Sequence, residues 1–125
     1  MTVSNDTLVR EFVDTFHHKD AAQLERFFDP DVVFCNYGDG EVHGRVAVLQ
    51  MWAGVFGRFE VVRFETVHQA VNGAVVLAEQ IHHLSFPGSP IAQVMNLAVY
   101  DLREGLITAW RDYTNPTYAA ELLRG

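Results

Sequence analysis

The chain has 125 residues, 49% of them hydrophobic and 20% charged, which is typical of one globular domain spanning residues 1–125. Its net charge is −7 and its nine Lys and Arg residues are scattered, so nucleic-acid binding is not expected, because that needs clustered cations. No signal-peptide pattern and no apolar stretch of about 18 residues occurs, so no membrane association is expected. The lone cysteine, Cys35, cannot form an internal disulfide and fits a cytoplasmic protein.

The first half of the chain predicts three helices and one strand. After the cap candidates at residues 4–6, apolar residues recur at spacings of three and four as far as Phe16, which predicts an amphipathic helix. Asp20 begins a second, short helix that ends before Pro30. The stretches that follow are "VVFCNY" (32–37), a strand; "GDGEVHG" (38–44), a turn-rich link; and "RVAVLQMWAGVF" (45–56), a helix.

The second half predicts four strands and a terminal helix. The strands cover roughly residues 59–71, 74–84, 91–102 and 106–113, and the dipeptide "NG" at 72–73 is a hairpin signal. Asn115 then caps a helix that starts at Pro116. Strands that follow helices in this way indicate an α+β fold, in which helices pack on one face of a curved antiparallel sheet.

The strand "VMNLAVYDL" (94–102) is apolar on both faces. One face can pack on the helices, and the other needs a cover. A second copy of the chain is the simplest cover, so the sequence predicts a homodimer that pairs through the outer sheet face.

Strand alternation places polar residues on one otherwise apolar face of four strands. They are Asn36, Gln80 with His82, Asn96 and Asp112. If these faces converge, they form an apolar pocket with a few polar groups, which is the usual anatomy of a small-molecule site. Asp112 could instead form a structural ion pair, and His82 could be an interior histidine.

The histidines do not predict a metal site. His82 and His83 are adjacent on a strand and point to opposite faces, and no HxH or HExxH spacing occurs among the six histidines. We therefore expect neither a metal nor another cofactor.

The order of elements, the stretch "FFDPDVVF" (27–34) and above all "GLITAWRDYTNP" (105–116) resemble the NTF2-like superfamily, and within it the SnoaL-like and limonene-epoxide-hydrolase-like branch. This resemblance implies a cone of curved sheet and helices around a pocket, as in the cystatin-like folds, and usually a dimer. It also implies one of several functions: epoxide hydrolase, ketosteroid isomerase, polyketide cyclase or binding module without catalysis.

Only part of the epoxide-hydrolase site is matched. Asp112 matches the aspartate that activates water in those enzymes, and Asn36 matches the Asn that helps to hold the water. Gln80 and His82 stand where those enzymes have an Arg and an Asp, and Phe34 stands where they have a Tyr. The epoxide-opening triad is therefore incomplete.

The ketosteroid-isomerase site is also broken. Its base and its oxyanion-hole acid fall on Asn36 and Asn96, and its Tyr falls on Phe12. An isomerase site of that standard kind is therefore not expected.

The remaining candidate is a pair formed by His82 and Asp112. A carboxylate near the ring would orient it and favour its protonated form, and the pair could carry out acid–base catalysis near neutral pH. Asn36, Gln80 and Asn96 could orient a substrate or a water molecule. The expected aromatic walls are Phe34, Trp110, Phe12, Phe16 and Trp52.

The sequence thus predicts a cofactor-independent acid–base enzyme that acts on a hydrophobic small molecule, by isomerisation, cyclisation or epoxide opening. One alternative is a ligand-binding module without turnover, and another is an interaction domain that uses the sheet face. For each of these three functions Arg111 should face outward, because it precedes the inward-facing Asp112 on the same strand.

Overall fold

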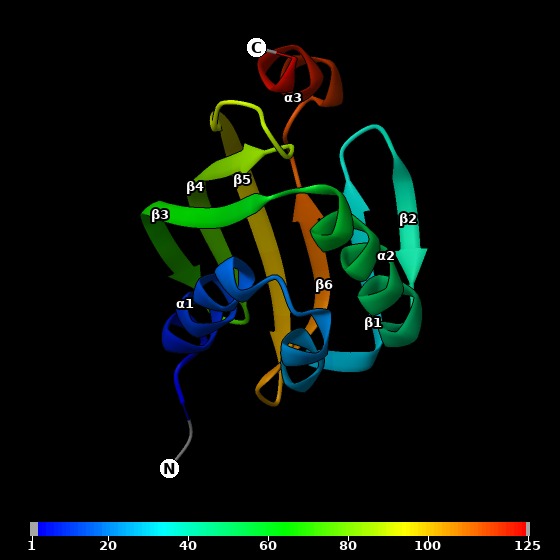
Figure 1. Ribbon diagram of the computed structural model, residues 1–125. Helices are drawn as coiled ribbons and strands as arrows, with labels where there is room; N and C mark the ends of the chain where they lie inside the picture. The colour runs from blue at the N-terminus through cyan, green and yellow to red at the C-terminus, as the bar shows by residue number, and fades with distance from the viewer. Residues whose placement is uncertain (1–2, 125) are drawn as a thin grey trace.

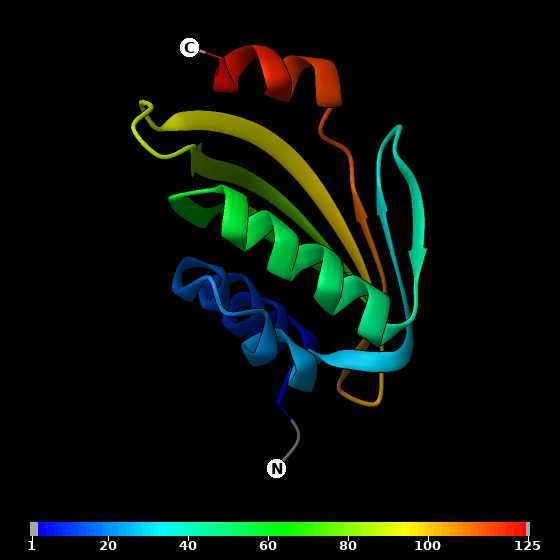
Figure 2. The same ribbon diagram turned by 45° about the vertical axis from the view of Figure 1, so that its right-hand side comes forward.

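The structure is a computed structural model that describes residues 3–124. The elements in chain order are α1 (Asn5–Thr15), the 3₁₀ turns η1 (Phe16–His18) and η2 (Ala21–Phe27), β1 (Phe28–Asn36), β2 (Gly40–His43), α2 (Arg45–Arg58), β3 (Val61–Asn72), β4 (Val75–Ser85), β5 (Ala92–Arg103), β6 (Leu106–Asp112) and α3 (Pro116–Leu123). Helices α1 and α2 lie against the concave face of a curved sheet, and α3 lies across its open end (Figures 1 and 2). The α+β fold predicted from the sequence is confirmed.

The six strands form one sheet in the order β2-β1-β6-β5-β4-β3. Strands β3 to β6 pair antiparallel, as predicted, whereas β1 pairs parallel with β6. Because of this parallel pairing, Asn36 and Asp112 lie side by side at the open end of the sheet. The pairing joins segments that are far apart in sequence, and no local pattern indicated it.

Strand β2 was not predicted, because residues 38–44 were expected to be a link without a strand. Gly38 and Gly40 both adopt positive φ angles, +89° and +84°. These glycines reverse the chain tightly, so that Glu41, Val42 and His43 return along β1 as an antiparallel hairpin. One wall of the open end is therefore a hairpin.

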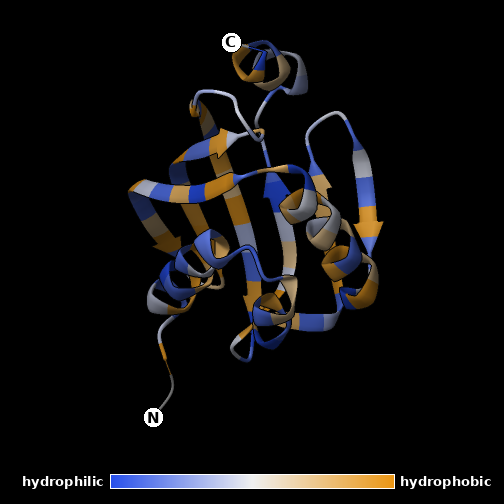
Figure 3. Ribbon diagram, viewed as in Figure 1, coloured by the Kyte–Doolittle hydropathy of each residue, from blue (hydrophilic) through white to orange (hydrophobic). Residues whose placement is uncertain are grey.

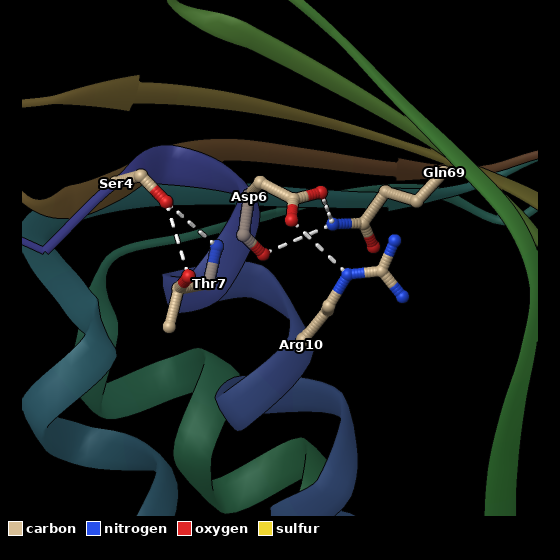
Figure 4. Close-up of polar contacts among 5 residues, drawn as sticks. All are labelled: Ser4, Asp6, Thr7, Arg10 and Gln69. Carbon is tan, nitrogen blue, oxygen red and sulfur yellow. Dashed lines mark hydrogen bonds and ion pairs between the residues drawn. The ribbon is translucent and has the colours of Figure 1, made fainter.

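Side-chain contacts fix the start of α1 (Figure 4). The Ser4 hydroxyl accepts a hydrogen bond from the Thr7 backbone N–H and caps the helix. Asp6 accepts hydrogen bonds from Arg10 at 3.2 Å and from Gln69 of β3 at 2.9 Å, and these bonds lower the pKa of the Asp6 carboxyl. The Gln69 contact attaches α1 to the sheet.

The core lies between α1, α2 and the sheet, where apolar positions of both layers meet (Figure 3). Phe12 packs edge-on against Phe16 and Trp110, with ring centroids 5.0 and 5.3 Å apart. Trp110 also stacks on Trp52 of α2, with 5.2 Å between the centroids. This aromatic cluster fills the closed part of the cone. Among residues 3–124, no helix is long and apolar enough to cross a membrane.

Candidate functional site

A cavity of about 440 Å³ opens between α2, α3 and the strand ends at the open end of the sheet. Its lining residues are the apolar Phe34, Gly40, Val42, Met51, Trp52, Val55, Leu84, Val94 and Ala119, and the polar Asn36, Asp39, Arg58, His82, Asp112 and Thr114. An apolar wall with a few polar groups is the usual composition of a site for a small organic molecule.

Asp112 is the most buried carboxylate of this lining. Its Oδ1 atom accepts a hydrogen bond from Trp110 Nε1 at 2.7 Å and another from Asn96 Nδ2 at 3.0 Å. Burial raises the pKa of the Asp112 carboxyl from 3.8 to about 6, and the two hydrogen bonds act in the opposite direction. The group is therefore mostly ionised at neutral pH and can still accept a proton, which suits a general base.

The Asn96 amide connects the polar groups behind the cavity wall. Its Oδ1 atom accepts a hydrogen bond from Thr114 Oγ1 at 2.6 Å, which turns the amide nitrogen towards Asp112. The same nitrogen lies 3.3 Å from Gln80 Oε1 and 3.3 Å from His82 Nε2. Asn96 therefore stands between His82 and Asp112, and no direct hydrogen bond joins the two.

His82 is held as a neutral ring. It stacks on Phe64 with 3.7 Å between the ring centroids, and its Nε2 atom lies 2.8 Å from Gln80 Oε1. An amide oxygen only accepts hydrogen bonds, so this shorter contact favours the tautomer with the ring proton on Nε2 over the one in which Nε2 accepts from Asn96 at 3.3 Å. Burial lowers the pKa of His82 from 6.5 to about 3, with a smaller contribution from His83. The expectation that a carboxylate would favour the protonated ring is therefore wrong, because desolvation dominates.

The predicted site residues fall into three groups. Phe34, Asn36, Trp52, His82 and Asp112 border the cavity. Gln80 and Asn96 lie behind its wall in the buried network. Phe12, Phe16 and Trp110 pack in the closed core and do not border the cavity, because the cone is filled with aromatic rings at that depth.

Three polar cavity residues were not singled out from the sequence: Asp39, Arg58 and Thr114. Asp39 lies in the β1–β2 turn and accepts a hydrogen bond from Asn36 Nδ2 at 3.1 Å. Thr114 comes two residues after the end of β6, so its closeness to Asp112 in sequence was the one signal that could have identified it. Within residues 3–124, no three His, Cys, Asp or Glu side chains come together as a metal site would require.

Arg111 faces away from the cavity, as strand alternation predicted. Its guanidinium donates two hydrogen bonds to the Asp101 carboxylate on the other face of the sheet, at 2.9 and 3.1 Å. These contacts raise the pKa of Arg111. Arg111 and Asp112, adjacent on β6, therefore lie on opposite faces of the sheet and contact different residues.

Comparison with known proteins places the chain in a family. The SnoaL-like domain family matches residues 9–110. An LEH-like epoxide hydrolase from M. tuberculosis is 26% identical, with a TM-score of 0.82 over 95% of this chain and 89% of that one. A protein from Shewanella denitrificans named as a SnoaL-like polyketide cyclase is 15% identical, with a TM-score of 0.84 over 95% and 96% of the two chains.

An NTF2-like protein of unknown function from Burkholderia pseudomallei is 17% identical, with a TM-score of 0.87 over 99% and 100% of the two chains. The likenesses below 25% identity establish the shared fold. Together with the family match, they confirm the resemblance seen in the sequence. The chain belongs to the SnoaL-like family and has the NTF2-like fold.

Proposed function

We propose that this protein is a cofactor-independent enzyme that transfers a proton at a carbon next to a carbonyl group of an apolar small molecule, as isomerases and cyclases do. The observation that carries the proposal is a buried carboxylate, Asp112, that borders an apolar cavity and has its pKa raised to about 6. A base with a pKa near the working pH transfers protons efficiently in both directions.

In this mechanism one carboxylate does the proton transfer. Oδ1 of Asp112 accepts the hydrogen bonds from Trp110 and Asn96, and Oδ2 has no hydrogen-bond partner among the described side chains. Oδ2 takes the proton from carbon as the C–H bond breaks, and the electron pair moves into an enolate. Where a C=C bond adjoins the deprotonated carbon, the enolate is a conjugated dienolate; the same carboxyl group returns the proton to its far carbon, which shifts the double bond and restores the base.

The state of His82 favours proton shuttling over epoxide opening. Epoxide opening needs an acid for the ring oxygen as well as a base for water. His82 stays neutral because of burial, and its Nε2–H is already donated to Gln80. A reaction that uses a single carboxylate therefore fits this site better.

The test uses β-tetralone, an apolar ketone, and follows exchange of its α-protons in heavy water by NMR. We expect Asp112→Asn to slow the exchange by at least about 100-fold, because an amide is not a base. The wild-type rate should rise with pH and level off above about pH 6. Asp31→Asn, at an exposed position in β1, is the control. Equal rates for Asp112→Asn and wild type would contradict the proposal.

The second candidate is a ligand-binding module without turnover. The neutral His82 favours it, because the cavity then lacks a second group that exchanges protons near neutral pH. This candidate predicts that apolar ketones and epoxides such as styrene oxide bind and raise the melting temperature, and that no product or exchange is detected.

We also propose that the protein is a cytoplasmic homodimer. Leu77, Met95 and Leu97 are exposed on the convex face of the sheet, with 39 to 54% of each residue accessible. Such an apolar strip is unfavourable in water, and a second copy of the same strip would cover it. The lone Cys35 suits a reducing compartment.

A further inference from the structure

The polar groups of the cavity are mostly hydrogen-bond acceptors. Asp112 and Asp39 are carboxylates, the hydroxyl proton of Thr114 is used by Asn96 and the Met95 carbonyl, and the Asn36 amide nitrogen already donates a hydrogen bond to Asp39. A ligand oxygen that needs a hydrogen-bond donor therefore finds few partners in this wall.

Arg58 supplies the cationic donor of this lining. It is the only Lys or Arg side chain in the lining, and among residues 3–124 it forms no ion pair and no side-chain hydrogen bond. It is the last residue of α2 and follows Trp52 and Val55 at helical spacing on the face that borders the cavity. Asp112, by contrast, comes from the sheet side of the cavity.

We propose that the ligand of this cavity is an apolar compound with a carboxylate group, and that Arg58 binds this carboxylate. The planar guanidinium matches a carboxylate with two parallel hydrogen bonds and stays charged at all relevant pH values. Anywhere else in the lining the carboxylate would meet Asp39 or Asp112 without a cation. Binding at Arg58 therefore also fixes the direction of the ligand, with its apolar part towards Phe34 and Trp52 and its reacting carbon towards Asp112.

The net charge of −7 does not prevent this binding. At physiological ionic strength the field of a charge decays over about 8 Å, so nearby groups count most. A cation at a helix C-terminus also stabilises the helix, and Arg58 has that position. That structural role predicts lower stability on substitution but no change in preference between ligands, so the two roles can be separated.

The experiment compares naphthylacetate with naphthylethanol, which share the ring system and differ in charge. Calorimetry gives the dissociation constants for wild type, Arg58→Gln, Arg58→Lys and the control Arg103→Gln, whose exposed arginine lies at the opposite end of β5. In wild type the acid should bind about five- to tenfold more tightly than the alcohol. Arg58→Gln should remove this preference, Arg58→Lys should keep part of it, and Arg103→Gln should leave it unchanged.

Equal binding of acid and alcohol by wild type, a preference that survives in Arg58→Gln, or no binding of the acid would each overturn the inference. It rests on the cavity of the proposed function, but the two fail separately. If acid preference depends on Arg58 while Asp112→Asn exchanges protons normally, the proposed catalysis fails and the carboxylate site stands. If Asp112→Asn abolishes exchange while acid and alcohol bind equally, the carboxylate site fails and the proposed catalysis stands.

Discussion

At the scale of single residues, the ionised side chain of Asp112 lowers the free energy of unfolding. Folding raises its pKa from 3.8 to about 6, so the folded state holds the proton more tightly than the unfolded state does. The stability that this provides is complete below about pH 4 and is lost as the pH rises through 6. With roughly 1.4 kcal/mol per pKa unit, the loss is about 3 kcal/mol.

Asp112→Asn should therefore be more stable than wild type at about pH 8, by up to about 3 kcal/mol, and nearly equal to it at about pH 4. The new amide oxygen can still accept the hydrogen bonds of Trp110 and Asn96. Urea unfolding at both pH values measures the difference, with Asp31→Asn as the matched control. A difference that does not depend on pH would show that the buried charge is not the cause.

Thr114 is expected to control the same carboxyl group through Asn96. Thr114→Val removes the hydroxyl that holds the amide oxygen, so the amide nitrogen is no longer fixed towards Asp112. The hydrogen bond from the Asn96 amide lowers the pKa of Asp112, so weakening it should raise that pKa in Thr114→Val. Carbon-13 NMR of the carboxyl group follows this titration.

Thr114→Ser keeps the hydroxyl and should retain the wild-type pKa of Asp112. If Thr114→Val and Thr114→Ser titrate alike, the hydroxyl does not orient the amide. Neither measurement requires a substrate, so both remain informative whatever the protein's function.

At the scale of elements, two glycines should respond in opposite directions to the same substitution. Gly73, between β3 and β4, has a φ of +61°, a conformation that is costly for any residue with a Cβ atom. Gly54 lies inside α2, where an added Cβ has no neighbour within 4 Å. Gly73→Ala should lower the free energy of unfolding by about 1 kcal/mol, and Gly54→Ala should raise it by up to about 1 kcal/mol.

Thermal or urea unfolding of the two variants measures both effects, and each variant serves as the control of the other. If both substitutions raised, or both lowered, the free energy of unfolding, the local backbone conformation would not determine the effect of adding a Cβ atom. The "NG" signal at 72–73 located this hairpin correctly in the sequence. The hairpin made by β1 and β2 was missed because its glycines are separated by Asp39 and its second strand is short.

At the scale of the whole molecule, the convex sheet face should control assembly. Leu97→Lys places a charge in the exposed apolar strip, and burying a charge at an apolar interface is costly. We expect the dimer to dissociate at least about tenfold more readily in this variant, as measured by sedimentation velocity across a concentration series. Val46→Lys, an equally drastic change on the exposed side of α2, should have no effect.

A wild-type protein that sediments as a monomer at micromolar concentration would contradict the dimer. The interaction of Arg111 with Asp101 lies on the same outer face of the sheet and is only partly exposed. Charged pairs of this kind are compatible with the polar, solvent-accessible rim of an apolar interface.

Local sequence patterns were enough to predict most elements, β2 excepted, and which side chains of each strand share a face. Alternation along β6 is a local property of a strand, so Arg111 and Asp112 had to point to opposite faces, and they do. The same rule assigned Asn96 and His82 to the concave side, where both are buried. The family resemblance likewise rested on the order of elements and on two contiguous stretches, 27–34 and above all 105–116.

The interactions among these inward groups, by contrast, depend on the tertiary structure. The parallel pairing of β1 with β6 brings Asn36 beside Asp112, and the Asn96 amide separates Asp112 from His82. Burial then moves the pKa of Asp112 up and that of His82 down. Desolvation and strand register depend on segments that are distant in the chain, and so the chemistry of the site could not be read from any single stretch of it.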